Sequence, residues 1–194
     1  MISRISILVF NNVEVLDFSG PFEVFHTARS YCEGPPPIVE LVSPTTETIQ
    51  TVGGMQIQAT TSMDRCLHTD LLVIPGGAGT RPLLNQPQVI DWIAQRSRQA
   101  ILTLSVCTGA LLLAKAGLLN QLTITTHHSA LSELKQLAPR SDVQTNRRFI
   151  DNGEIITAAG ISAGIDASLY TVARIYRPET AEQVAHHMEY DWHS

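Results

Sequence analysis

Short runs of branched and apolar residues recur along the chain, and segments with helical spacing lie between or after them. Runs of this kind are typical of strands that are buried on both faces of a parallel sheet. The alternation of strand and helix predicts an α/β fold in which helices cover both faces of a mostly parallel sheet. We expect strands at residues 5–10, 38–42, 71–74 and 100–104, and helices at residues 19–30, 88–98 and 108–116.

Local signals refine these boundaries. Ser19 is a capping candidate for the first helix, with Pro21 close to its first turn, and Pro87 precedes the second helix. Two segments have the pattern of β-hairpins. We expect hairpins at residues 46–60, around Gly53 and Gly54, and at residues 148–157, a short strand at 122–125, and closing helices at 161–176 and 180–190, separated by Pro178.

The composition excludes several classes of protein. The formal net charge is -5, and no stripe of Lys and Arg is present to hold a phosphate backbone. The three cysteines form no close pair, which argues against a disulfide framework or a structural zinc site and favours reduced thiols. The first apolar run is too short for a signal peptide. We expect a cytoplasmic protein that binds neither nucleic acid nor membrane.

No repeat, low-complexity tract or linker divides the chain, so we expect residues 1–194 to form one domain. Residues 100–119 have the length of a membrane span and a single charge, Lys115. The interior of this segment argues against a span, because a candidate turn interrupts it at Cys107.

Cys107 is the strongest candidate for chemistry, since it lies between an apolar run and a helix-like segment. Small residues, Ser105 and Gly109, flank it at i-2 and i+2, as a tight nucleophile elbow requires. The N-terminus of the following helix is expected to favour the thiolate. The alternative is a small buried hydrophobic residue, and for Cys32 and Cys66 we favour that interpretation.

A glycine-rich turn, with Gly76 and Gly77, follows the strand expected at residues 71–74. Glycines allow backbone N–H groups to approach a ligand closely. A phosphate-binding P-loop is the first alternative, but its Lys-Ser/Thr pair is absent. We therefore interpret the turn as part of an oxyanion hole, in which the backbone amides of Gly77 and Thr108 donate.

Two carboxyl groups, Asp17 and Glu23, follow the first expected strand. Helix capping explains most aspartates at such a turn, and a solvated helix face would explain Glu23. Either group becomes a candidate general acid or base if the first strand lies beside the strand that leads to Cys107, which a doubly wound sheet permits.

Histidines occur in the adjacent pairs His127–His128 and His186–His187, and again at His193. Neighbouring side chains point in different directions, so we expect only one of the first pair to approach the cysteine, with His127 as an auxiliary candidate. Adjacent histidines make a poor chelate, and no cluster of cysteines or carboxylates completes a ligand set. We therefore expect no metal.

These segments together resemble the ThiJ/PfpI superfamily, a group of class I glutamine amidotransferase-like proteins, and within it the isonitrile hydratase branch. The residues that carry the resemblance extend over nearly the whole chain. They are DFSGPFEVF at 17–25, IPGG at 74–77, SVCTGA at 105–110, Thr126–His127 and EYDW at 189–192.

The resemblance implies a flavodoxin-like three-layer sandwich, usually a homodimer, with Cys107 as the reactive residue and without metal or organic cofactor. Peptidase-like members have a histidine directly after the cysteine, where this chain has Thr108. The isonitrile hydratase branch is similar to this chain in having Thr at that position and Asp at the position of Asp17.

Membership of that branch would imply hydration of a small isonitrile to an N-substituted formamide. Cys107 would attack the substrate, Asp17 would carry the proton, and Thr108 would orient the substrate or relay the proton. Two alternatives stay open. One is glyoxalase-like hydrolysis of 2-oxoaldehydes, with proton transfer by His127, and the other is a non-enzymatic redox or small-ligand sensor that uses the same cysteine.

The same module forms the N-terminal half of AraC-type transcription regulators. This chain ends soon after Trp192. We therefore expect no attached helix-turn-helix domain and no regulator of the AraC kind.

Overall fold

A seven-stranded sheet lies at the centre of the computed structural model, which describes residues 2–192. The strands are β1 (Arg4–Leu8), β2 (Ile38–Ser43), β5 (Thr61–Ser62), β6 (Leu71–Ile74), β7 (Leu102–Val106), β10 (Phe149–Asp151) and β11 (Ile155–Ala158). Their order is β10-β11-β7-β6-β1-β2-β5. All neighbours are parallel except β10, which is antiparallel to β11.

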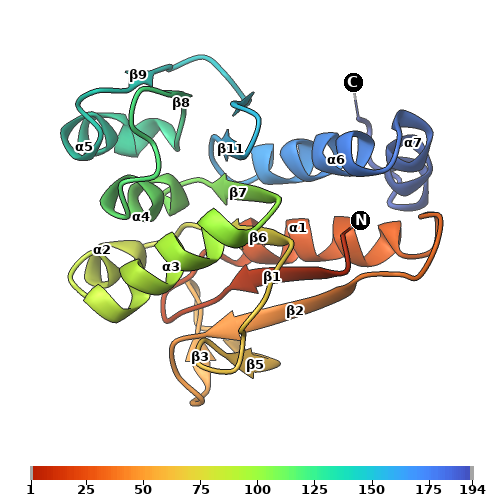
Figure 1. Cartoon of the computed structure of the whole chain (residues 1–194), viewed down its shortest axis with the longest axis horizontal. Helices are drawn as coiled ribbons and strands as arrows, with labels where there is room; N and C mark the ends of the chain where they lie inside the picture. The colour runs from red at the N-terminus through yellow and green to blue at the C-terminus, as the bar shows by residue number, and fades with distance from the viewer. Residues whose placement is uncertain (1, 193–194) are drawn as a thin grey trace.

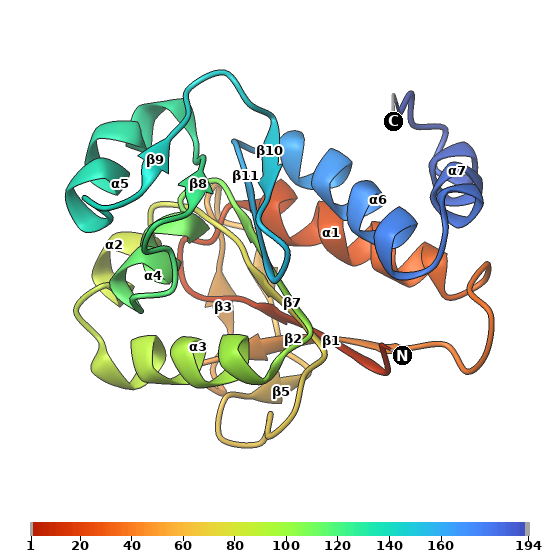
Figure 2. The ribbon, with the colours of Figure 1, turned by 45° about the horizontal axis from the view of Figure 1, so that its top comes forward.

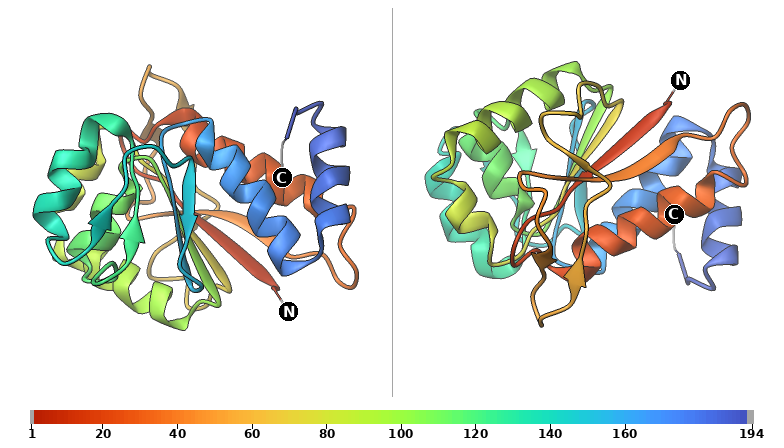
Figure 3. Two further views of the ribbon diagram at one scale, coloured as in Figure 1. Left: turned by 90° about the horizontal axis from the view of Figure 1, so that it is seen from above. Right: turned by 90° about the horizontal axis from the view of Figure 1, so that it is seen from below.

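Two layers of helices enclose this sheet, as Figures 1 and 2 show. One face is covered by α1 (Val15–Ala28) and α6 (Ala163–Ile175), and α7 (Pro178–His187) packs against these two helices. The other face is covered by α2 (Thr80–Leu83), α3 (Pro87–Gln99), α4 (Gly109–Lys115) and α5 (Leu131–Leu137). The views from above and below show the sheet between the two layers (Figure 3). The predicted α/β sandwich with a mostly parallel sheet is therefore confirmed.

Short elements decorate this framework. Two two-stranded sheets are formed by β3 (Ile49–Gln50) with β4 (Gln56–Ile57) and by β8 (Thr123–Ile124) with β9 (Asp142–Val143). A 3-10 turn, η1 (His128–Ala130), precedes α5. The two predicted hairpins are confirmed as β3–β4 and β10–β11. The pattern did not indicate α2, α5, β5 or β9.

The core lies on both sides of the central strands. Every residue of β6 and β7 is buried, including the polar Thr103 and Ser105. Burial on both faces explains why β6 is an uninterrupted apolar run, whereas in β7 the buried Thr103 and Ser105 alternate with apolar residues. Because β1, β6 and β7 run in one direction, their carboxyl ends meet at one edge of the sheet.

The start of α1 differs from the prediction. The helix begins at Val15, four residues before the capping candidate Ser19, whose hydroxyl donates instead to the Val15 carbonyl at 2.7 Å. Pro21 lies inside the helix and is buried there, although proline removes a helical hydrogen bond. Tertiary packing overrides the local signal, and as a result Asp17 lies in the first turn of α1.

A catalytic role for Asp17 was expected if the first strand lay beside the strand that leads to Cys107, and this condition is not met. β1 is not the neighbour of β7, because β6 lies between them. The segment that leads into α1 nevertheless crosses the end of β6, where the Glu14 N–H donates to the Gly76 carbonyl at 2.9 Å. Asp17 therefore reaches the end of β7 from two strands away.

The apolar segment at residues 100–119 does not form one long helix. It contains β7, the turn at Cys107 and α4. Within residues 2–192, no helix combines the length and apolar character that crossing a membrane requires.

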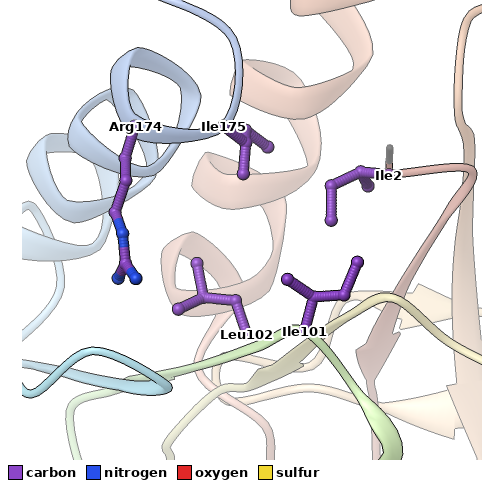
Figure 4. Close-up of a pocket in the computed structure, with 5 residues that line it drawn as sticks. All are labelled: Ile2, Ile101, Leu102, Arg174 and Ile175. Atoms are coloured by element: carbon purple, nitrogen blue, oxygen red, sulfur yellow. The ribbon is translucent and has the colours of Figure 1, made fainter.

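A cavity of about 280 Å³ opens at the amino ends of the strands. It is lined by Ile2, Ile101, Leu102, Arg174 and Ile175 (Figure 4). Leu102 begins β7, whereas Cys107 follows the last residue of this strand. The cavity therefore lies at the edge of the sheet opposite Cys107.

Packing of α4 against β6 generates a first prediction. A Cβ at Gly109 would lie 2.0 Å from the Ile74 carbonyl oxygen, which is backbone and cannot move aside cheaply. We expect Gly109→Ala to lower the free energy of unfolding by about 3 kcal/mol or more, measured by urea denaturation. Gly117→Ala is the control, because its Cβ meets open space and only its φ of 71° opposes the change, at about 1–2 kcal/mol. Equal stability of the two variants would contradict the close approach.

Candidate active site

Cys107 occupies the turn between β7 and α4. Its φ of 55° lies in the left-handed region, which few residues other than glycine adopt and which fits a nucleophile elbow. Its N–H donates to the Ala159 carbonyl at 2.9 Å, and its own carbonyl accepts from the Thr126 hydroxyl at 2.7 Å. The elbow is thus held by the end of β11 and by the loop after β8, and Cys107 is 7% exposed.

Asp17 interacts with this cysteine from the first turn of α1. Its carboxyl group is fully buried, and Oδ2 accepts from the Gly76 N–H at 3.1 Å. Oδ1 is buried without a partner at hydrogen-bond distance among the described residues. The Cys107 thiol and the Ile161 backbone interact with the same carboxyl group. A buried carboxyl oxygen with unused acceptor capacity beside a thiol can receive its proton.

Two glycines make this approach possible. A Cβ at Gly76 would lie 2.6 Å from the Thr108 nitrogen and 2.8 Å from Asp17 Oδ2. Gly77 has a φ of 125°, and a Cβ there would lie 2.4 Å from the Asn12 carbonyl oxygen. Both positions therefore require glycine, for steric rather than for phosphate-binding reasons.

The pKa values of Asp17 and Cys107 differ from what a stable Cys107 thiolate, as expected from the sequence, would require. Burial raises the pKa of Asp17 from 3.8 to about 6, partly offset by the hydrogen bond from Gly76. Burial and the negative charge of Asp17 raise the pKa of Cys107 to about 12, and these effects outweigh the hydrogen bonds from Thr108 that lower it. At neutral pH the aspartate is charged and the thiol keeps its proton.

Thr108 connects the elbow to the glycine turn. Its hydroxyl oxygen accepts from the Gly77 N–H at 2.9 Å. That amide, which the sequence suggested as an oxyanion donor, is thus engaged by a side chain. The second suggested donor, the Thr108 N–H, donates towards the Cys107 sulfur. The oxyanion role of Gly77 stays a prediction, and it requires the Thr108 hydroxyl to move.

His127 lies beside the site, and its contacts are with the neighbouring loops. Its ring packs on Gly160, where an added Cβ would lie 2.0 Å from the ring carbon Cδ2. Its Nδ1 is 2.8 Å from the Ser129 hydroxyl and accepts from the Ser129 N–H at 3.3 Å. Partial burial, and then the neighbouring His128, lower the pKa of His127. A neutral ring at this position is fixed by the loop, and its part in chemistry stays a prediction.

Glu23 is not brought to the elbow. It is exposed, and its carboxyl group accepts from the Thr27 hydroxyl one turn further along α1 at 3.3 Å. The reason is helical geometry, since six residues place Glu23 on a different side of the helix from the buried Asp17.

The second histidine pair, His186–His187, ends α7. His187 contacts the Tyr31 hydroxyl at 3.2 Å, and His193 lies outside the described residues. Within residues 2–192, no group of three histidine, cysteine or carboxylate side chains could hold a metal ion.

Three residues of the site were not assigned a role from the sequence. The charge of Glu14 raises the pKa of Asp17 and opposes the lowering of the pKa of His127. Ile161 has a φ of 53°, unusual for a β-branched residue, and its backbone interacts with Asp17. The Thr80 hydroxyl donates to the Gly77 carbonyl at 2.8 Å. Glu14 is part of the same conspicuous segment as Asp17, but nothing in the sequence distinguishes the other two.

Together, the fold and the site define a class of protein: an α/β sandwich in which a cysteine elbow at the carboxyl edge of the sheet faces a buried aspartate. Residues 3–174 match the DJ-1/PfpI family, and the chain belongs to this family. The resemblance to the ThiJ/PfpI superfamily is therefore confirmed.

Relatives of this chain have different functions. It is 33% identical to isonitrile hydratase from Pseudomonas putida over 98% of this chain and 79% of that protein. It is 31% identical to the HTH-type transcriptional regulator CdhR from Pseudomonas aeruginosa over 68% of this chain and 39% of the regulator. The crystal structure of a ThiJ/PfpI family protein from Pseudomonas syringae superposes with a TM-score of 0.89 at 27% identity, covering 100% of this chain and 77% of that one.

The raised pKa of Asp17 generates a prediction about stability. Because the folded state holds the proton more tightly than the unfolded state does, stability falls as the pH rises from about 4 through 6. We expect Asp17→Asn to increase the free energy of unfolding at neutral pH by up to about 3 kcal/mol. Urea denaturation at several pH values measures this gain, which should shrink towards about pH 4.

Glu23→Gln is the matched control, because it neutralises an exposed carboxyl group on the same helix. We expect its stability to follow that of the wild type at every pH. A gain from Asp17→Asn that did not depend on pH would contradict the raised pKa.

Proposed function

We propose that this protein hydrates isonitriles, R–NC, to N-substituted formamides, with Cys107 as nucleophile. The observation that carries the proposal is the buried pair of an ionised Asp17 and a protonated Cys107 thiol. The 33% identity to isonitrile hydratase over nearly the whole chain supports the choice of substrate class.

The pair supplies what addition to an isonitrile carbon requires. That carbon accepts a nucleophile and must also receive a proton. As the sulfur attacks the carbon, the thiol proton passes to Asp17 and from there to the carbon, giving the thioimidate R–N=CH–S–Cys107. The free thiolate, which the site disfavours, therefore never has to accumulate, and no proton is gained or lost overall.

Water completes the reaction. It adds to the thioimidate carbon while its proton passes to nitrogen, giving R–NH–CH(OH)–S–Cys107. Collapse of this intermediate expels the sulfur, which regains a proton by way of Asp17, and releases R–NH–CHO. The Thr108 N–H, which donates towards the sulfur, favours departure of the sulfur as an anion.

The two alternatives are less well supported by the site. A glyoxalase-like reaction would use His127, whose Nδ1 contacts Ser129. A redox sensor requires an exposed thiolate of low pKa, whereas Cys107 is 7% exposed and its pKa is raised to about 12. Isonitrile hydration needs a thiol with a neighbouring proton acceptor, which is the observed arrangement.

Substitution of either member of the pair tests the proposal. With cyclohexyl isocyanide as substrate, we expect Cys107→Ala to abolish formamide formation and Asp17→Asn to lower kcat/KM by a factor of about 10²–10⁴, the usual contribution of a general acid or base. Chromatography of the formamide measures both. Glu23→Gln, our control, should retain wild-type activity. Turnover by Cys107→Ala at the wild-type rate would exclude the cysteine as nucleophile.

The pH dependence of the rate provides an independent test. Asp17 must be ionised to accept the thiol proton, and its pKa is about 6. We therefore expect kcat/KM to fall tenfold per pH unit below about 6 and to level off above it. A rate that instead kept rising through the ordinary thiol range would indicate attack by a pre-formed thiolate, and would contradict this mechanism.

A further inference from the structure

Thr80, the first residue of α2, is a fully buried threonine that the proposed reaction does not use. It lies behind the glycine turn, and its hydroxyl is 2.8 Å from the Gly77 carbonyl oxygen and 3.2 Å from the Thr108 hydroxyl oxygen. Burial of a hydroxyl group costs free energy unless the group forms hydrogen bonds. The hydrogen bonds that Thr80 forms around Gly77 indicate what its hydroxyl does.

The Gly77 carbonyl has more potential donors than it can accept. A carbonyl oxygen has two lone pairs. Three donors lie near this one: the Thr80 hydroxyl at 2.8 Å, the Thr80 N–H at 3.2 Å and the Thr108 hydroxyl at 3.2 Å. Both groups of Thr80 together fill the two lone pairs. The Thr108 hydroxyl, at 3.2 Å from the same oxygen, is the donor that competes with them.

The proton of Thr108 then has another acceptor. Its hydroxyl oxygen already accepts from the Gly77 N–H at 2.9 Å, which fixes the oxygen in place and leaves its proton free to turn. A hydrogen bond from the Thr108 side chain also lowers the pKa of Cys107, which makes the sulfur a second acceptor for this proton. With the carbonyl filled, the proton points to the sulfur.

We propose that Thr80 is a positioning residue, which fills the Gly77 carbonyl and thereby directs the Thr108 hydroxyl proton to the Cys107 sulfur. The inference rests on the proposed function in that Cys107 is the nucleophile there. Without the Thr80 hydroxyl, the Thr108 proton turns to the vacant lone pair of the carbonyl, and the sulfur loses a donor that stabilises negative charge.

Alkylation of Cys107 by iodoacetamide tests this without any isonitrile. The test uses a background in which Cys32 and Cys66 are replaced by serine, so that one thiol reacts. We expect Thr80→Val, which keeps the shape and removes the hydroxyl, to raise the pKa of the thiol by about one unit. The thiolate fraction at about pH 8 then falls about tenfold, and the greater nucleophilicity of the more basic thiolate offsets part of this loss, so the alkylation rate should fall about three- to tenfold. Thr80→Ser should restore the wild-type rate.

Controls separate positioning from general loss of structure. Thr171→Val removes another buried hydroxyl, one that donates to the Ala167 carbonyl at 2.7 Å in α6, and should leave alkylation unchanged. In a Thr108→Val background, Thr80→Val should have no further effect, because the hydroxyl that it acts through is gone. If Thr80→Val does not fold, Thr80→Ala carries the same expectation. A folded Thr80→Val or Thr80→Ala variant that alkylates at the wild-type rate would overturn the inference.

The same variants distinguish this inference from the proposed function. Slower alkylation in a protein that hydrates no isonitrile would support the role of Thr80 and refute hydration. Isonitrile hydration by the wild type, together with unchanged alkylation in Thr80→Val, would support the proposed function and refute the role of Thr80.

Discussion

The close approach of the α1 segment to the carboxyl ends of β6 and β7 is the constraint on which the rest of the site depends. Gly76 donates to Asp17 where a Cβ would collide with both the carboxylate and Thr108. Gly109 similarly allows α4 to start directly on β6. These close approaches bring a carboxyl group and a thiol from distant parts of the chain into one buried volume.

Burial then decides how the pair is charged. Desolvation raises the pKa of both acids, and the negative charge of Asp17 further raises the pKa of Cys107. The pair therefore carries one negative charge, on the carboxylate, over the neutral pH range. This arrangement differs from that of an exposed, acidic thiol, because the proton is stored next to the sulfur. It suits a reaction in which bond formation to carbon and proton delivery to the same carbon must occur together.

Much of this fold was predictable because its central strands are buried on both faces, and such strands are recognisable as short segments rich in apolar residues. The elbow was predictable for a similar reason, since a tight turn demands small neighbours at Ser105 and Gly109. The start of α1 was not, because Ser19 and Pro21 are local signals that packing of the whole helix overrode. The exposed position of Glu23 was not predictable either, since the side of the helix that faces the site depends on tertiary contacts.

By itself, the sequence determined the α/β layering, the cysteine at the strand–helix turn and the need for glycine beside it, because each follows from short-range sterics or from the burial of continuous segments. Only the tertiary structure decided that β6 separates β1 from β7, that Asp17 still reaches Cys107 across it, and that the thiol keeps its proton. It alone brought Thr80 to the Gly77 carbonyl. Charge states and hydrogen-bond competition depend on what surrounds a group in space, and residues far apart in the chain supply those surroundings here.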